Sequence, residues 1–357
     1  MTKTNLSGLS REELVTFCTS LEESNYRAGQ IFSWIHAKLV SSFAEMTDLS
    51  ISCRARLEEV AVLESLTLIS IQDSTQTSAR KFLFELFDGA RIESVYLPDS
   101  GRHTVCLSSQ VGCPLDCSFC ATGKMGFIRN LTAAEIMAQL ICIQKEVDER
   151  ISNVVFMGMG EPLLNYDAVV KAASLINDKN GFAIGARKII ISTAGIVSNI
   201  VRFADEGHRF GLAFSLNATG EASRSAVMPI TKKYTLADCL DALSYYSKKL
   251  RRQVTLEYIL MNGVNDSDED ARRLSSFTRR LKCKLNIIPY NPIPGDAAKR
   301  PTKEELNTFV KKLLPSKSIV TVRWSQGSDI SAACGQLYSQ IKRGTARKQM
   351  EETSAAS

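Results

Sequence analysis

The spacing of apolar residues along the chain changes from a helical period to a strand period. Apolar residues first recur at three- and four-residue intervals, which predicts three amphipathic helices, SREELVTFCTSL, YRAGQIFSWIHAKL and ISCRARLEEVAVL. Ser10, with Glu13 three residues later, is typical of a capping box that begins the first helix. From Leu66 the period becomes two, in SLTLISIQ, RKFLFELF and RIESVYLP, and Asp88-Gly89 predicts a hairpin turn between the last two strands.

After Thr104, segments with strand and helix patterns alternate. The predicted strands are HTVCLSS, NVVFMGM, KIIIST, GLAFSL, VTLEYIL and KLNIIPYN, and we expect the helices between them to begin near Thr132, Tyr166, Gly195, Thr235 and Ser267. Six such units predict an α/β fold with a parallel sheet curved into a partial (β/α)6 barrel, whose functional site lies at the carboxyl ends of the strands. A further strand, IVTVRWS, precedes a loop and a last helix around Cys334 to Arg343.

These patterns divide the chain into four parts. We expect a helical N-terminal domain at 1–64, a small antiparallel β extension at 65–101 and the barrel core at 102–344. The remaining residues, 345–357, are polar and are expected to be frayed.

The composition is that of an ordinary globular protein, because 44% of the 357 residues are hydrophobic and 23% are charged. The first residues lack the basic and apolar regions of a signal peptide, and no apolar run approaches the roughly 18–20 residues that span a bilayer. We therefore expect a cytoplasmic protein without a membrane partner. In a reducing compartment, its ten cysteines are expected to include metal ligands or reactive thiols. The net charge of +6 permits an anionic partner.

Three cysteines, Cys113, Cys117 and Cys120, form a C-x3-C-x2-C cluster in VGCPLDCSFCATG, directly after a predicted strand. Three thiolates so close in sequence can surround one small metal centre. They suit a [4Fe-4S] cluster with one iron left open, because a purely structural cluster takes four cysteines. A structural zinc site, with Cys106 or His103 as the fourth ligand, is the alternative.

The cluster, with Phe119 before its last cysteine, resembles the radical S-adenosylmethionine (SAM) superfamily. Longer segments resemble the RlmN/Cfr family of radical SAM RNA methyltransferases, in order and from about Tyr26 to Lys342: TVCLSSQVGCPLDCSFCATG, FMGMGEPLLN, ISTAGI, LAFSLNA, VMPITKKY, EYILMNGVND, NIIPYNPIPG and DISAACGQL. The resemblance implies two cofactors. These are one [4Fe-4S] cluster on Cys113, Cys117 and Cys120, and SAM, of which two molecules are consumed per turnover.

Glycines and short polar residues at the ends of predicted strands are candidates for SAM binding. In GMGEP the glycines allow close backbone approach and the carboxylate can accept the SAM ammonium, although a plain Gly-Pro turn is the alternative. The resemblance assigns SAM contacts to Gly160, Glu161, Ser192, Ser215, Leu216, Asn217 and Asn291. Asn217 stands where the family more often has histidine, and Trp324 stands where we expect a basic residue.

Three further residues are candidates for catalysis. Glu93 shares a strand face with apolar residues, so its carboxylate is either exposed at an edge, which is favoured, or positioned with a raised pKa. Cys334 lies in a loop of small residues entering the last helix, whose N-terminus would lower the pKa of its thiol. By resemblance Glu93 is the proton acceptor, Cys334 forms the S-methylcysteine intermediate, and Cys106 resolves it through a transient disulfide with Cys334. We expect the other five cysteines to be packing residues: Cys18, Cys53, Cys142, Cys239 and Cys283.

The resemblance implies methylation of adenine C2 in 23S rRNA, at the peptidyl transferase centre, and in tRNA, at the adenosine 3' of the anticodon. The alternatives are C8 methylation of the same rRNA adenosine and a non-catalytic RNA-binding protein with a structural metal. Flavodoxin or ferredoxin is the expected electron donor, and the protein is expected to be a monomer. Candidate RNA contacts are the basic clusters Lys248, Lys249, Arg251 and Arg252; Arg272, Arg273, Arg279 and Arg280; and Lys342, Arg343, Arg347 and Lys348.

Overall fold

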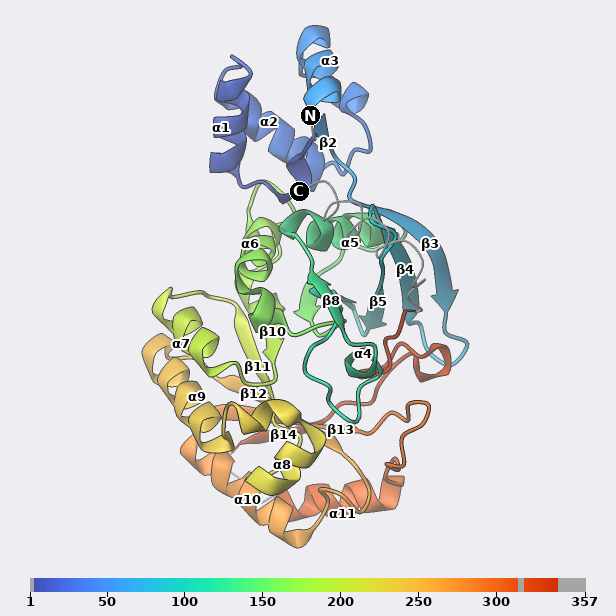
Figure 1. The fold of residues 1–357 in the computed structure, drawn as a ribbon, viewed down its shortest axis with the longest axis vertical. Helices are drawn as coiled ribbons and strands as arrows, with labels where there is room; N and C mark the ends of the chain where they lie inside the picture. Colours follow the sequence, from blue (N-terminus) through green and yellow to red (C-terminus); the bar gives the residue numbers. More distant parts are fainter. Residues whose placement is uncertain (1–2, 314–317, 340–357) are drawn as a thin grey trace, which may run out of the picture.

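The N-terminal region is a small helical unit. A computed structural model describes residues 3–313 and 318–339, in which the first helices are α1 (Arg11–Ser20), α2 (Tyr26–His36) and α3 (Ile51–Val60). The predicted capping box is confirmed, because the Ser10 hydroxyl accepts from the Glu13 amide and the Glu13 carboxylate accepts from the Ser10 amide. Figure 1 shows the three helices gathered at one end of the molecule.

A parallel sheet forms the barrel, as predicted. Its strands are β6 (Arg102–Cys106), β9 (Asn153–Phe156), β10 (Ile189–Thr193), β11 (Gly211–Ser215), β12 (Val254–Leu260), β13 (Cys283–Pro289) and β14 (Ile319–Val322). Each pairs in parallel with the next in this order. All their carboxyl ends therefore lie at one edge.

The antiparallel strands continue this sheet. They are β3 (Leu66–Asp73), β4 (Arg80–Leu86) and β5 (Arg91–Asp99), and β5 pairs with β6 so that all ten strands form one sheet. The predicted hairpin at Asp88-Gly89 is confirmed, with Gly89 at a φ of +77°. Because β5 runs antiparallel to β6, its first residues lie at the carboxyl ends of the parallel strands. The extension therefore brings Glu93 to the expected site edge.

Helices cover the barrel (Figure 1). They are α4 (Ala121–Lys124), α5 (Ala133–Lys145), α6 (Tyr166–Asn177), α7 (Val197–Asp205), α8 (Glu221–Val227), α9 (Leu236–Leu250), α10 (Asp268–Arg280) and α11 (Lys303–Leu313). The predicted starts at Thr132, Thr235 and Ser267 are confirmed as capping boxes. The prediction lacked α4, α8 and α11. None of the described helices is both long and apolar enough to cross a membrane.

Short elements fill the connections between these helices and strands. They are the strands β1 (Thr4–Asn5), β2 (Ala61–Val62), β7 (Gln110–Gly112) and β8 (Phe127–Asn130), and the 3-10 helices η1 (Leu6–Gly8), η2 (Phe43–Glu45), η3 (Pro162–Asn165), η4 (Ala186–Lys188), η5 (Pro229–Lys232) and η6 (Ser328–Ile330). β7 and β8 pair with each other on either side of the cysteine cluster.

The predicted helix around Cys334 is wrong over the described residues. Residues 331–339 form turns and extended chain, and both Ser331 and Gly335 have positive φ values, which an α-helix does not accommodate. A Cβ on Gly335 would lie 3.0 Å from the Phe119 carbonyl oxygen. The small residues here therefore serve close packing against the cysteine loop. The rest of this predicted helix and the predicted tail lie outside the described residues.

Candidate active site at the carboxyl ends of the barrel strands

The cysteine cluster lies in a buried loop between β7 and α4. Cys113 and Cys117 are buried and Cys120 is half-buried, and they pack with apolar residues that include Phe119 and Tyr290. The loop is fixed by backbone hydrogen bonds, including Ala121 N–H to the Gly335 carbonyl at 2.7 Å. A compact loop of this kind keeps the three thiols at the edge of the barrel.

The three thiols have raised pKa values. Burial raises the pKa of Cys113 to about 12 and that of Cys117 well above its usual value, and the neighbouring thiol of Cys120 raises both further. Buried thiolates crowded in this way need a cation, and binding a metal would release their protons.

The donor chemistry fits an iron–sulfur cluster, but the side chains are not preassembled around one. Across residues 3–313 and 318–339, no three His, Cys, Asp or Glu side chains are grouped closely enough to hold a metal ion. The zinc alternative gains no fourth ligand from His103, whose Nδ1 lies 2.7 Å from the Tyr96 hydroxyl. His103 also lies near the amino end of β6, whereas the cysteine loop follows its carboxyl end. The three cysteines of this loop suit a cluster with an open iron, which takes three protein thiolates.

Glu161 is locked into the loop after β9. Its carboxylate is 3% exposed and accepts hydrogen bonds from the backbone N–H groups of Leu163 at 2.9 Å and Ala194 at 2.7 Å. Burial raises its pKa to about 7, although these hydrogen bonds lower it. Gly160, at a φ of +101°, is required here because a Cβ would lie 2.5 Å from Cβ of Gln110. GMGEP is therefore a tightly built loop rather than a plain turn, and it lies near Cys113 and Cys117.

Ser192 and Ser215 lie at the ends of neighbouring strands, β10 and β11, as predicted. Leu216 and Asn217 follow and are buried. Both polar atoms of the Asn217 side chain have partners within the protein: its Oδ1 accepts from the Ile259 N–H at 3.0 Å, and its Nδ2 lies 3.5 Å from Met228 Sδ. Its left-handed φ of +55° is one that asparagine tolerates.

Arg224 is a buried residue that the sequence did not single out. Its guanidinium donates to the carbonyl oxygens of Ala194 at 2.6 Å, Leu216 at 3.0 Å and Ser215 at 3.1 Å, and to the Thr231 hydroxyl at 2.8 Å. Arg224 thus ties together the ends of β10 and β11, where the candidate SAM residues lie. One arginine in the short segment EASRSAV offers no periodic signal that would have revealed this role.

Asn291 connects the end of β13 to the loop of Cys334. It is 2% exposed, and its Nδ2 donates to the Ser325 hydroxyl at 2.9 Å and to the Cys334 carbonyl oxygen at 3.1 Å. Its Oδ1 lies 3.4 Å from a guanidinium nitrogen of Arg300. Asn291 therefore positions the backbone of the predicted catalytic cysteine.

Glu93 is buried, so the exposed alternative favoured from the sequence is wrong. Only 4% of the residue is exposed; its Oε1 lies 3.1 Å from Lys81 Nζ, and its Oε2 accepts from the Tyr338 N–H at 2.9 Å. Burial raises the pKa of Glu93, and the charge of Lys81 opposes this effect. The contact with Tyr338 joins this carboxylate to the chain four residues after Cys334. Sequence reasoning missed Lys81, because this partner comes from a different strand.

Cys106 and Cys334 lie close enough for the Cys334 thiol to affect the pKa of Cys106. Cys106 is buried at the end of β6; burial raises its pKa to about 12, and the Cys334 thiol raises it further. Both cysteines are free thiols in the structure. Arg323, after β14, lies beside them, and its pKa is raised mainly by Cys334. The site therefore brings together the cysteine loop, the two further thiols and Glu93.

Comparisons with known proteins match almost the whole chain. Residues 107–274 match the radical SAM superfamily, and residues 4–63 match the ribosomal RNA large subunit methyltransferase N-terminal domain. A probable dual-specificity RNA methyltransferase RlmN from Thermotoga petrophila is 46% identical, over 93% of this chain and 97% of its own. The Marinomonas sp. dual-specificity RNA methyltransferase RlmN is 42% identical, over 97% and 96%.

A solved structure shows the same fold. The crystal structure of a radical SAM methyltransferase from Sphaerobacter thermophilus superposes with a TM-score of 0.91 at 39% identity, covering 94% of this chain and 100% of that one. The expected radical SAM barrel with a further N-terminal domain is confirmed. The non-catalytic alternative has no support among these relatives, which are named as methyltransferases.

Proposed function

Because the chain belongs to the RlmN family of radical SAM RNA methyltransferases, we propose that it methylates adenine C2 in 23S rRNA, at the peptidyl transferase centre, and in tRNA, at the adenosine 3' of the anticodon. The relatives are named as having dual specificity for RNA, which supports two RNA substrates. The observation that carries the proposal is that Cys334 lies near both Cys106 and Cys120 of the cysteine loop, with Glu93 bound to the Cys334 segment.

The proposed cofactors are one [4Fe-4S] cluster on Cys113, Cys117 and Cys120 and two molecules of SAM per turnover. When bound, the cluster supplies the electron that cleaves SAM to the deoxyadenosyl radical. The proposed SAM contacts are Gly160, Glu161, Ser192, Ser215, Leu216, Asn217 and Asn291. The Glu161 carboxylate already accepts two backbone hydrogen bonds, and each of its oxygens has a further lone pair with which to accept from the SAM ammonium.

In this proposal, Cys334 carries the carbon that is transferred. Its thiolate takes a methyl group from the first SAM, and the positive guanidinium of Arg323 lies beside it. After that methyl group loses a hydrogen atom, its carbon adds to the adenine ring, and the unpaired electron of the adduct would return to the oxidised cluster. Asn291 holds the Cys334 carbonyl, which limits the motion of the loop during this step.

Glu93 and Cys106 complete the reaction. The Glu93 carboxylate accepts the proton that leaves the ring carbon, and its raised pKa makes it a stronger base than an exposed glutamate. Cys106 then attacks the Cys334 sulfur. The sulfur–carbon bond breaks, its electron pair stays on the carbon, and that carbon takes up a proton to complete the methyl group of the released adenine. The Cys106–Cys334 disulfide that forms is returned to thiols by an external reductant. Flavodoxin or ferredoxin is the proposed donor of electrons for SAM cleavage.

We also place the protein in the cytoplasm as a monomer, and we assign RNA holding to the N-terminal domain at 1–64, which is rich in exposed polar residues. Some of the predicted RNA contacts are partly neutralised in the structure. Lys249 pairs with Asp205, and both Arg272 and Arg273 pair with Glu269. The candidates from Lys342 onward lie outside the described residues.

Variants at the two thiols test the proposal. With reconstituted full-length protein, SAM and an RNA stem-loop, Cys106→Ala is expected to accumulate a covalent protein–RNA adduct, visible as a shifted band under denaturing conditions. Cys334→Ala should abolish methylation while SAM cleavage remains measurable. Cys142→Ala, at a half-buried thiol on α5, is the matched control and should behave like the wild type. A fully active Cys334→Ala enzyme, or normal product release by Cys106→Ala, contradicts the assignments.

A further inference from the structure

A basic cavity of about 680 Å³ lies at the end of the barrel opposite the cysteine loop. Its walls come from three chain segments, each of which leads into a parallel strand: 185–188 before β10, 207–209 before β11 and 249–252 before β12. Parallel strands begin at one edge of the sheet and end at the other. The cavity therefore lies on the amino-terminal face, away from the candidate active site.

Positive side chains dominate the lining of this cavity. No Asp or Glu lines it. Five of the ten lining residues are Lys or Arg: Arg187, Lys188, Arg209, Lys249 and Arg252. Among the described residues, the ion pairs that reach the lining are Lys249 with Asp205 and His208 with Glu206. The remaining four cations thus keep their charge uncompensated by an ion pair in the described part of the chain.

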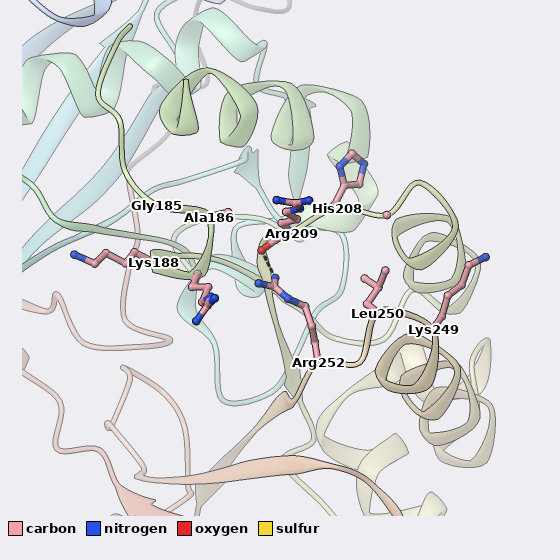
Figure 2. A pocket seen from close by; sticks show the side chains of 10 residues that line it. Gly185, Ala186, Lys188, His208, Arg209, Lys249, Leu250 and Arg252 are labelled. Atoms are coloured by element: carbon pink, nitrogen blue, oxygen red, sulfur yellow. Dashed lines mark hydrogen bonds between the residues drawn. The ribbon is translucent and has the colours of Figure 1, made fainter. Parts of the chain in front are cut away.

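One of these cations is preorganised. Figure 2 shows the Arg252 guanidinium hydrogen-bonded to the backbone oxygen of Arg209, and it also donates to the Phe210 carbonyl at 3.0 Å. Carbonyl acceptors orient a guanidinium without cancelling its charge. Arg187, Lys188 and Arg209 are exposed, so they are free to reach a ligand.

The general preference for cations at helix ends explains only part of this cluster. Lys249 is in the last turn of α9, where the helix dipole favours a positive charge. Arg187 and Lys188 lie instead in a three-residue 3-10 helix, and Arg209 and Arg252 lie beyond the ends of α7 and α9. Their convergence on one cavity is a property of the tertiary fold.

We propose that this cavity binds the phosphate backbone of an RNA segment remote from the target adenine. The proposal rests on RNA being the substrate. Several cations spread over separate loops suit successive phosphates, which position an RNA without reading its sequence. Turning a base out of folded RNA costs free energy, and remote phosphate contacts hold the RNA while that occurs.

An acidic electron-donor protein is a less suitable occupant. It must approach the cysteine loop, whereas this cavity is separated from that loop by the length of the barrel strands. A five-residue strand such as β10 spans roughly 17 Å at about 3.3 Å per residue. RNA is large enough to contact both faces of the barrel.

The test removes three exposed cations from the full-length enzyme, in Arg187→Gln/Lys188→Gln/Arg209→Gln. Arg102→Gln/Arg202→Gln/Lys312→Gln is the matched control, because it removes the same charge from exposed side chains that are already ion-paired and lie outside the candidate RNA-binding clusters. Fluorescence anisotropy measures binding of an RNA duplex without a target adenosine, over a series of salt concentrations. We expect the cavity variant to bind at least about tenfold more weakly at low salt, with a salt slope smaller by about 2.7, since three phosphate contacts are lost and each removes about 0.9.

Methylation of a short stem-loop, too small to reach the far face, separates this proposal from the proposed function. The wild type and the cavity variant should methylate it at equal rates. If the wild type does not methylate the stem-loop, the proposed function is refuted, and the duplex-binding result still tests the phosphate site separately. Duplex binding with unchanged affinity and salt slope would overturn the phosphate site. So would unchanged RNA binding together with slower reduction by flavodoxin, which would assign the cavity to a protein partner.

Discussion

Replacing Lys81 by methionine tests whether the buried Glu93 carboxylate acts as a base. The Lys81 nitrogen lies 3.1 Å from Glu93 Oε1, and the two side chains are 10% and 6% exposed. At an effective dielectric constant of 20, opposite charges at this distance attract by about 5 kcal/mol. Desolvation offsets part of that attraction. Removing one partner of a buried pair is therefore expected to lower the free energy of unfolding by about 3–5 kcal/mol.

The loss depends on pH with a definite sign. Burial already raises the pKa of Glu93, and Lys81 is the strongest influence that lowers it, so Lys81→Met raises this pKa further. The neutral carboxyl is tolerated and the unpaired carboxylate is not. The stability deficit should therefore grow as pH rises through the folded-state pKa and shrink at acidic pH. The activity of Lys81→Met should instead rise as pH rises, since Glu93 acts as a base only when it is deprotonated.

Urea unfolding and methylation rates, each followed from acidic to alkaline pH, measure the two effects. Lys81→Met should recover activity as pH rises, whereas Glu93→Gln should stay inactive throughout. Lys284→Met, which removes an exposed lysine from β13, is the control and should change stability by less than about 0.5 kcal/mol. An unchanged free energy of unfolding in Lys81→Met, or an activity loss as independent of pH as that of Glu93→Gln, would refute the reasoning.

Three further predictions concern other buried groups. Burial lowers the pKa of His36 from 6.5 to about 4, so the free energy of unfolding should fall by about 3 kcal/mol as pH falls from 6.5 to 4. His36→Phe should remove this pH dependence, measured by thermal melts. Gly160→Ala should prevent SAM cleavage, measured as deoxyadenosine release, because Gly160 has a φ of +101° and the Gln110 side chain lies close to it. Gly185→Ala is the control and should cleave SAM normally, since its Cβ would meet nothing within 4 Å. Arg224→Met leaves buried carbonyl groups without donors and should lower the free energy of unfolding by at least about 3 kcal/mol in urea, compared with under about 1 kcal/mol for Arg202→Met on the surface.

Local signals in the sequence predicted most of the elements. Capping boxes at Ser10, Thr132, Thr235 and Ser267 marked the starts of helices, because each involves residues only three apart. The alternation after Thr104 predicted the parallel sheet. The short helix α8 has too few turns to show a clear period, which accounts for its absence from the prediction.

Long-range contacts could not be predicted in this way. The burial of Glu93 depends on Lys81 from a neighbouring strand and on Tyr338 from the far end of the chain. Arg224 acts through carbonyl groups, which every residue carries and which leave no trace in the sequence. The last helix was predicted to begin around Cys334, where the structure instead has turns. Gly335 there packs against the cysteine loop.

Several assignments still depend on the family resemblance. The structure shows where Gly160, Glu161, Asn217 and Asn291 lie and what they bond to, and their contacts with SAM stay predictions. The same holds for the ligand role of the three clustered cysteines and for the disulfide between Cys106 and Cys334. The domain boundaries at 64, 101 and 344 also stay predictions, although the continuous sheet from β3 to β14 joins the second and third parts closely.

The most direct test of the account is mass spectrometry of RNA methylated by the reconstituted enzyme with SAM that carries a fully deuterated methyl group. If the carbon passes through Cys334, one deuterium is lost when the hydrogen atom is abstracted, and the methyl group on adenine C2 should keep only two. The missing deuterium should appear in deoxyadenosine. A product methyl group with all three deuterium atoms would mean direct transfer from SAM and would contradict the role of Cys334. A methyl group on C8 would contradict the proposed site of methylation.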